Sequence, residues 1–257
     1  MVSLFDTHCH LNAPELESRL DGLIEQAMQQ GVNRWLIPAT SPDQWAVIYQ
    51  LSLKYPGIQA ALGIHPWYVK KYALSSLNQI TELVEQHTDV LVAIGETGLD
   101  HFKPHFEQQI LYFETQLQLA SRLKLPVIIH CVKAQDEVVR CLKEGRVSRG
   151  VIHGFTGSYQ QAKQLIDLGM KIGVGGSITY PRASKTRDTI SSLPLDTLVL
   201  ETDAPAMPLS GFQGEPNVPH RLKMVFDVLV SLRAESKAQI SDTLWENSQE
   251  LFGSHSV

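Results

Sequence analysis

The chain has 257 residues, of which 43% are hydrophobic, and a formal net charge of −5. This length suits one large domain or two small ones, and single α/β barrels commonly have ~250 residues. The acidic balance argues against a protein that wraps nucleic acid extensively, and no segment approaches the ~20 consecutive apolar residues that a membrane span requires.

Cysteine usage and the N-terminal segment indicate the compartment. Cys9, Cys131 and Cys141 form no CxxC pair and are odd in number, which argues against a disulfide framework and favours a reducing environment. The segment MVSLFDTHCH lacks the basic stretch, apolar run and cleavage site of a secretory signal. We therefore expect a cytoplasmic protein with no membrane partner, whose oligomeric state the sequence does not indicate.

Eight short apolar runs predict the strands. Continuous apolar runs of this kind are typical of strands that are buried on both faces in a parallel sheet. In chain order the runs are VSLFDTH (from Val2), NRWLIPAT (from Asn33), IQAALGIHP (from Ile58), VLVAIGETGLD (from Val90), LPVIIHC (from Leu125), GVIHGF (from Gly150), MKIGVGG (from Met170) and DTLVLETDAP (from Asp196).

Amphipathic segments between these runs predict the helices. Residues 15–30 and 106–123 have apolar side chains at a period of 3.6, and shorter helices are expected at 158–168, 185–193, 225–232 and 240–251. Eight strand–helix alternations over ~250 residues predict an α/β fold of the (β/α)8 TIM-barrel type, with residues 1–257 as a single domain. A doubly wound open sheet is the alternative.

Chemically reactive side chains follow six of the eight runs. His8 and His10 end the first run, and two residues apart on a strand they would share a face. The others are His65, Glu96, His130, His153 and Asp203, after the third, fourth, fifth, sixth and eighth runs. The strand ends of a barrel converge on the face that carries active sites. Any one of these residues alone could be a satisfied core residue, but cations explain the whole set better.

The composition of this set indicates the kind of metal. Imidazoles and carboxylates suit Zn²⁺ or Mn²⁺ rather than Ca²⁺. His65 aside, the set offers six protein ligands, which are too many for one tetrahedral ion with an open catalytic position. We therefore expect two divalent metal ions per chain (Zn, Mn or Mg) that share one carboxylate.

The ordered motifs DTHCH, GIHP, GETGLD, VIIHC, IHGFTG and LETDAP resemble those of the TatD family of metal-dependent hydrolases, within the amidohydrolase-like barrels. The segment GVGGSITYPRASKTRD and the residues after LETDAP resemble the YjjV-type branch. The resemblance implies that His8, His10 and Asp203 hold one metal ion, that His130 and His153 hold the other, and that Glu96 bridges them. It also implies hydrolysis of phosphodiester bonds, typically exonucleolytic on DNA.

The sequence departs from the family pattern beside the fifth-strand histidine. Family members usually have an arginine two residues after it, where this chain has Val132 followed by Lys133. A lysine is a point charge without the bidentate fork of arginine. The pattern also differs at Gly154 and Thr97, neither of which is an expected ligand. The missing arginine weakens the expectation of efficient DNA cleavage.

Three further residues are predicted to contact the substrate. His65 is expected to face the site. In YPRASKTR (180–187), Arg182 and Lys185 follow the seventh run, where barrels often bind phosphate; a solvated helix start is the alternative. For Asp100, orienting a ligand histidine and capping the next helix are equally open, and Glu201 is expected to lie behind the ligands.

The sequence therefore predicts a two-metal hydrolase, a phosphodiesterase or deoxyribonuclease, that acts on a phosphoester such as a DNA end or a nucleotide. A metal-bridging hydroxide would attack, and Asp203 would take or orient its proton, with Glu96 as the shared catalytic ligand. The same centre could instead hydrolyse a small amide, ester or lactone, because fold does not determine function. A non-catalytic barrel with structural metals is the second alternative.

Overall fold

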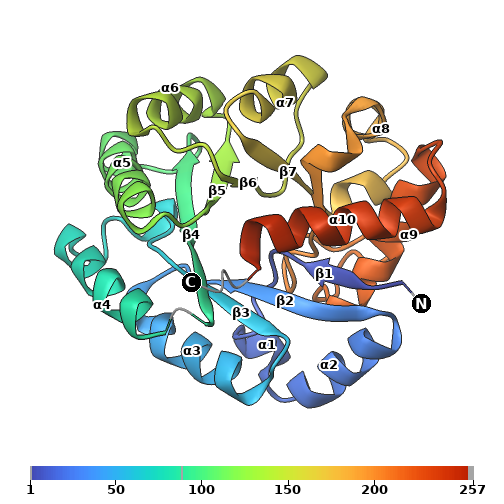
Figure 1. Ribbon diagram of the computed structural model, residues 1–257, viewed down its shortest axis with the longest axis horizontal. Helices are drawn as coiled ribbons and strands as arrows, with labels where there is room; N and C mark the ends of the chain where they lie inside the picture. Colours follow the sequence, from blue (N-terminus) through green and yellow to red (C-terminus); the bar gives the residue numbers. More distant parts are fainter. Residues whose placement is uncertain (1, 88, 254–257) are drawn as a thin grey trace. The chain divides into compact units, whose positions relative to one another are not determined.

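The computed structural model describes residues 2–87 and 89–253. Its eight strands form one sheet in the order β1 to β8 (Figure 1), and the pairings β1–β2, β3–β4, β4–β5, β5–β6 and β7–β8 are parallel. The strands are β1 (Leu4–Asp6), β2 (Val32–Pro38), β3 (Ile58–Leu62), β4 (Leu91–Asp100), β5 (Val127–Val132), β6 (Gly150–Ile152), β7 (Met170–Val174) and β8 (Leu198–Leu200). Each of the eight predicted strands is confirmed.

Helices alternate with the strands along the chain. They are α1 (Pro14–Glu17), α2 (Leu20–Gln29), α3 (Trp45–Lys54), α4 (Asn78–Gln86), α5 (Phe106–Leu123), α6 (Gln135–Gly145), α7 (Tyr159–Ile166), α8 (Ser184–Ser192), α9 (Leu222–Leu232) and α10 (Lys237–Phe252). No described helix is long and apolar enough to span a bilayer. The helix predicted at 106–123 coincides with α5.

The single helix predicted at 15–30 is wrong. The chain forms α1 and α2 instead, and Arg19 between them has non-helical dihedrals (φ −126°, ψ 10°). Leu16 in α1 and Leu20 and Leu23 in α2 are all buried. A 3.6-period stripe cannot reveal this break, because the apolar residues on both sides of it are buried in either arrangement.

The described residues group into two compact units. The first consists of the described parts of 1–37, 153–163 and 172–250, and the second of those of 38–152, 164–171 and 251–257. The first unit contains β1, β8, α1, α2, α8 and α9; the second contains β3 to β6 and α3 to α6. The single-domain organisation expected from the sequence stays a prediction.

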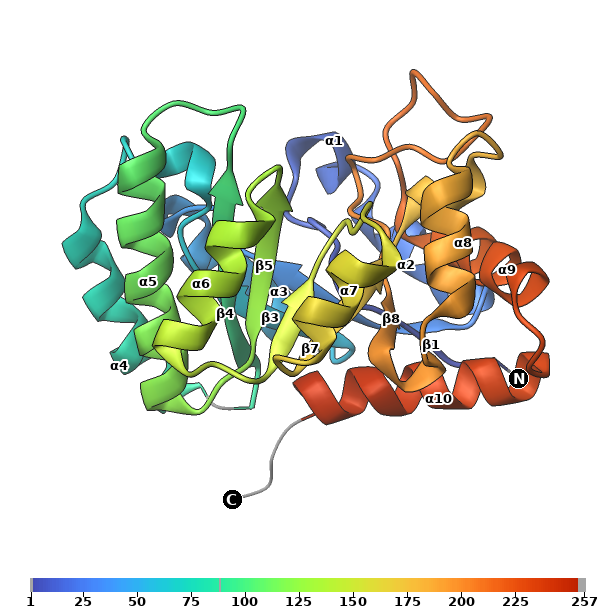
Figure 2. The same ribbon diagram turned by 90° about the horizontal axis from the view of Figure 1, so that it is seen from above.

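In the second unit, α5 lies along β4 (Figure 2). All ten residues of β4 and all five of β3 are buried, as expected for strands in the interior of a parallel sheet. In the first unit, α9 packs against β1 and β8. These contacts fix the strand ends from which the candidate site residues extend.

Candidate metal centre

In the first unit, the segments after β1 and β8 are held together by backbone hydrogen bonds. The Asp203 amide donates to the His8 carbonyl (2.8 Å), and the His10 amide donates to the Ala204 carbonyl (2.7 Å). The sequence predicted that His8 and His10 share one face of a strand. This prediction is wrong, because β1 ends at Asp6 and both histidines lie in the loop after it. They share a site because these cross-connections fold their loop against the segment after β8.

Asp6 and Thr202 reinforce this junction. The buried Asp6 carboxylate accepts hydrogen bonds from the Thr202 amide (2.9 Å) and hydroxyl (2.6 Å). Burial raises the pKa of Asp6 to about 7, although the bonds from Thr202 oppose the shift. No local sequence pattern marks this link, apart from the position of Asp6 at the start of DTHCH.

His8, His10 and Asp203 form the first group that could hold a cation. Nε2 of His8 lies 3.2 Å from Nε2 of His10, and each of these atoms is 3.5 Å from Oδ1 of Asp203. Burial alone would raise the pKa of Asp203. The hydrogen bond from His10 and the nearby imidazoles outweigh it and lower this pKa below its usual value. Asp203 is therefore ionised at neutral pH, as a metal ligand must be.

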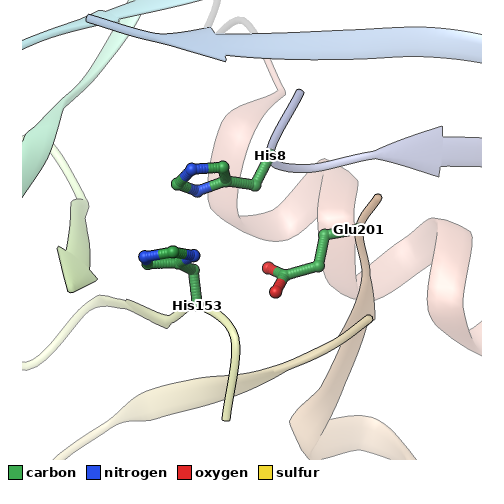
Figure 3. Close-up of side chains that lie close together, drawn as sticks. All are labelled: His8, His153 and Glu201. Atoms are coloured by element: carbon green, nitrogen blue, oxygen red, sulfur yellow. The ribbon is translucent and has the colours of Figure 1, made fainter. Parts of the chain in front are cut away.

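His8 is shared with a second group formed with His153 and Glu201 (Figure 3). The rings of His8 and His153 are stacked, with their centroids 4.0 Å apart and their planes at 15°. One Glu201 oxygen accepts a hydrogen bond from the Gly154 amide. The other, Oε2, is buried and accepts no hydrogen bond from the described residues. Burial raises the pKa of Glu201 to about 8 despite the opposing effect of His153.

These two groups fit a divalent cation. All their candidate donor atoms are imidazole nitrogens or carboxylate oxygens, and within each group they lie within 4.8 Å of one another. Such donors suit first-row divalent metals. From the sequence we expected Glu201 behind the ligands, because it lies two residues before Asp203. In the structure its carboxylate lies within 4.8 Å of ring nitrogens of His8 and His153.

The second unit contains a third group, formed by His65, Glu96 and His130. The β4–β5 pairing sets Gly98 opposite His130, which brings Glu96 and His130 to the same strand ends. Oε1 of Glu96 lies 3.1 Å from Nε2 of His65 and 3.2 Å from Nδ1 of His130. The structure thus brings three of the predicted site residues together in this unit.

The hydrogen bonds of His65 indicate its role. The Trp67 amide donates to Nδ1 of His65 (3.2 Å), so in the neutral ring Nε2 carries the proton and faces Glu96 as a donor. A protonated nitrogen is not a metal ligand. His65 therefore orients Glu96 in this arrangement, and its predicted contact with substrate stays a prediction.

Asp100 lies behind His130. Its Oδ2 is 3.6 Å from Nε2 of His130 and accepts a hydrogen bond from the indole of Trp67 (2.7 Å). Carboxylates that hydrogen-bond a metal-binding histidine orient its ring. Asp100 is the last residue of β4, and the residue at the N-cap of α5 is His105. The helix-capping alternative is therefore wrong. The 3.6 Å separation from His130 is longer than a hydrogen bond, so the orienting role stays a prediction.

The predicted phosphate-binding residues lie on the first unit's surface. The Arg182 guanidinium carbon is 5.2 Å from the centre of the Tyr180 ring. Lys185 lines a shallow depression together with Asp188. In the second unit, Val132 ends β5 and Lys133 is exposed after it. No observed contact tests whether Arg182 and Lys185 bind substrate, so this assignment stays a prediction.

A parallel eight-stranded α/β sheet with imidazoles and carboxylates at its strand ends defines the class of TIM-barrel metal-dependent hydrolases. The family model described as TatD related DNase matches residues 5–253. The chain therefore belongs to the TatD family, as the motifs predicted.

Individual relatives agree with this assignment. The chain is 46% identical over 250 residues to the uncharacterized metal-dependent hydrolase YjjV of Escherichia coli K12, with 96% of both chains covered. The crystal structure of that TatD homologue superposes with a TM-score of 0.94 at 45% identity and covers 97% of both chains. A more distant relative, human deoxyribonuclease TATDN3, is 30% identical over 265 residues, which cover 98% of this chain and 95% of that protein. These comparisons confirm the predicted TIM-barrel fold and the YjjV-type resemblance.

Proposed function

We propose that the protein is a metal-dependent phosphodiesterase that acts on nucleic acid, with DNA ends as the first substrates to test. The observation that carries the proposal is the group of His8, His10 and Asp203, whose donor atoms converge at the ends of β1 and β8. The family description and the deoxyribonuclease name of the human relative support this substrate class. An amide, ester or lactone substrate is the alternative that the experiment below distinguishes.

The residues of the chain have separate tasks in this proposal. A bound divalent ion would lower the pKa of water and polarise a phosphoryl oxygen. Asp203, ionised because the imidazoles outweigh its burial, can accept a hydrogen bond from an attacking water and orient it. In the second unit, His65 donates to Glu96 and thereby fixes the orientation of a carboxylate that the sequence assigns to catalysis.

The experiment combines metal reconstitution with a substrate panel. The protein loaded with Zn²⁺, Mn²⁺ or Mg²⁺ is assayed on end-labelled single- and double-stranded DNA, nucleotides, and small esters and lactones. We expect cleavage of phosphodiesters, and an Asp203→Asn variant should lose about 10²–10⁴-fold in rate. Asp242→Asn, an exposed change in α10, is the matched control. Cleavage restricted to esters or lactones would refute the phosphodiesterase proposal.

The two-ion arrangement is a separate proposal with its own measurement. Metal analysis after reconstitution should give two ions per chain. If Glu96 is the shared ligand, Glu96→Gln should reduce both occupancies, whereas His130→Ala should empty mainly one site. Full metal content in both variants would contradict the bridging assignment of Glu96 and the ligand role of His130.

A further inference from the structure

Two large aromatic residues are exposed near the group formed by His65, Glu96 and His130 in the second unit. Trp67 is 52% exposed and Phe102 is 73% exposed. The Trp67 ring centre lies 5.1 Å from that of His65 and 6.1 Å from that of His130, with both pairs nearly perpendicular. The half-exposed indole therefore lies next to His65 and His130.

The two aromatic residues are held in place by one buried carboxylate. Asp100, only 3% exposed, accepts hydrogen bonds from the Trp67 indole (2.7 Å) and, through its other oxygen, from the Phe102 amide (2.9 Å). The fully buried Gln109 accepts a hydrogen bond from the Asp100 amide (2.8 Å) and donates to the Lys103 and Pro104 carbonyls. The Trp67 ring is thus fixed through its indole, and the Phe102 backbone through its amide. A ring that is already fixed loses less conformational entropy when a ligand binds to it.

A cation completes this surface. The ammonium group of Lys103 lies 4.2 Å from the centre of the Trp67 ring, within cation–π range. An exposed lysine beside a fixed aromatic ring suits a ligand that offers a flat π-face and a negative charge together. Nucleotides in single strands offer both, because aromatic side chains stack with unpaired bases and cations follow the backbone.

We infer that Trp67, together with Phe102 and Lys103, is a stacking platform for an unpaired base next to the scissile phosphodiester. The inference rests on the proposed function and deepens it, because it makes the substrate a single-stranded end rather than a fully paired duplex. The base stacks on the indole face, and Lys103 contacts a phosphate of the same strand. Specificity then comes from the presence of a base and not from its identity, since every base has a π-face.

The first experiment compares a short single-stranded DNA with the same strand carrying abasic terminal nucleotides. The metal-loaded parent should show a KM about tenfold or more lower for the normal strand. Trp67→Ala should remove this preference, so that the ratio of the two KM values falls to about one, whereas Trp67→Phe should keep most of it. An unchanged preference in Trp67→Ala, or equal KM values for both strands in the parent, would overturn the inference.

Lysine variants test the charge. Lys103→Met should reduce the salt dependence of single-strand binding by about one unit of slope. Lys54→Met is the matched control, because Lys54 also lies over an aromatic ring, Tyr55, at 4.7 Å. Equal salt slopes in Lys103→Met and Lys54→Met would overturn the role of Lys103.

A binding measurement separates this inference from the proposed function. Fluorescence of the parent minus that of Trp67→Phe reports Trp67 alone, and it is recorded in EDTA as oligonucleotide is added. Quenching by single strands and weaker quenching by blunt duplexes would support the platform even if no phosphodiester is cleaved. Cleavage of phosphodiesters without quenching would agree with the proposed function and refute the stacking platform.

Discussion

Gln116 connects α5 to the segments that carry His65 and Glu96, and its removal gives the sharpest test of how the second unit positions them. The side chain is fully buried. It accepts a hydrogen bond from the Ile64 amide (2.8 Å) and donates to the Ile64 carbonyl (3.1 Å) and the Thr97 hydroxyl (2.6 Å). Ile64 precedes His65, and Thr97 follows Glu96.

The expected loss of stability follows from the hydrogen-bonding groups that a Gln116→Met variant leaves without partners. Methionine has a similar shape but cannot pair the Ile64 amide and carbonyl or the Thr97 hydroxyl. Each buried group without a partner costs about 1–3 kcal/mol, so the free energy of unfolding should fall by about 3 kcal/mol or more. For a chain of this size, that corresponds to a Tm lower by about 6–12 °C.

The assay is urea unfolding of the metal-free protein followed by circular dichroism, with metal affinity measured separately by calorimetry. Gln118→Met is the control, because Gln118 lies on the same helix but is exposed, and it should stay within about 0.5 kcal/mol of the parent. We expect Gln116→Met also to weaken metal binding, since both flanking residues lose their support. Equal stabilities of the two variants would refute this reasoning.

Three further predictions concern other parts of the chain. Gly98 has φ +137°, and a Cβ there would lie 2.0 Å from the His130 carbonyl oxygen, so Gly98→Ala should lower the metal content. Gly22→Ala is the control and should not change it, because a Cβ at Gly22 meets no atom within 4 Å. Burial raises the pKa of the Cys141 thiol to about 11, so at pH 8 only about one thiol in a thousand is ionised. A thiol-reactive dye should therefore modify Cys141 rapidly only after denaturation. Arg233 is nearly buried and donates to two backbone carbonyls at the end of α8. Arg233→Met should therefore reduce the free energy of unfolding, measured by urea titration, by about 2–4 kcal/mol. A loss below about 0.5 kcal/mol would contradict the stabilising role of these hydrogen bonds.

The strands could be predicted from the sequence because a parallel sheet buries both faces of each strand. That requirement produces continuous apolar runs, such as the one before His130, whose ends are visible without any tertiary information. The polar residues at those ends were informative for the same reason. A strand that ends in His or Glu, repeated several times, is difficult to explain by packing alone.

Other features depend on contacts between distant segments and left no local pattern. The break between α1 and α2 lies within an uninterrupted apolar stripe. The link from Asp6 to Thr202 spans most of the chain, and the indole of Trp67 binds Asp100 from a different loop. Hydrogen bonds of this kind are specified by the folded geometry, so a periodicity analysis cannot find them.

Three carboxylates of the first unit show why residue type alone does not assign a role. Burial raises the pKa of Asp6 to about 7 and that of Glu201 to about 8, so both tend to hold a proton near neutral pH. Asp203 is also buried, but His10 and its neighbouring imidazoles lower its pKa and keep it ionised. Asp6 therefore suits a structural hydrogen-bond partner, whereas Asp203 suits a cation ligand. The sequence Glu201-Thr202-Asp203 does not reveal that the pKa values of its two carboxyl groups differ. The difference arises from the imidazoles that the fold brings close to each carboxylate.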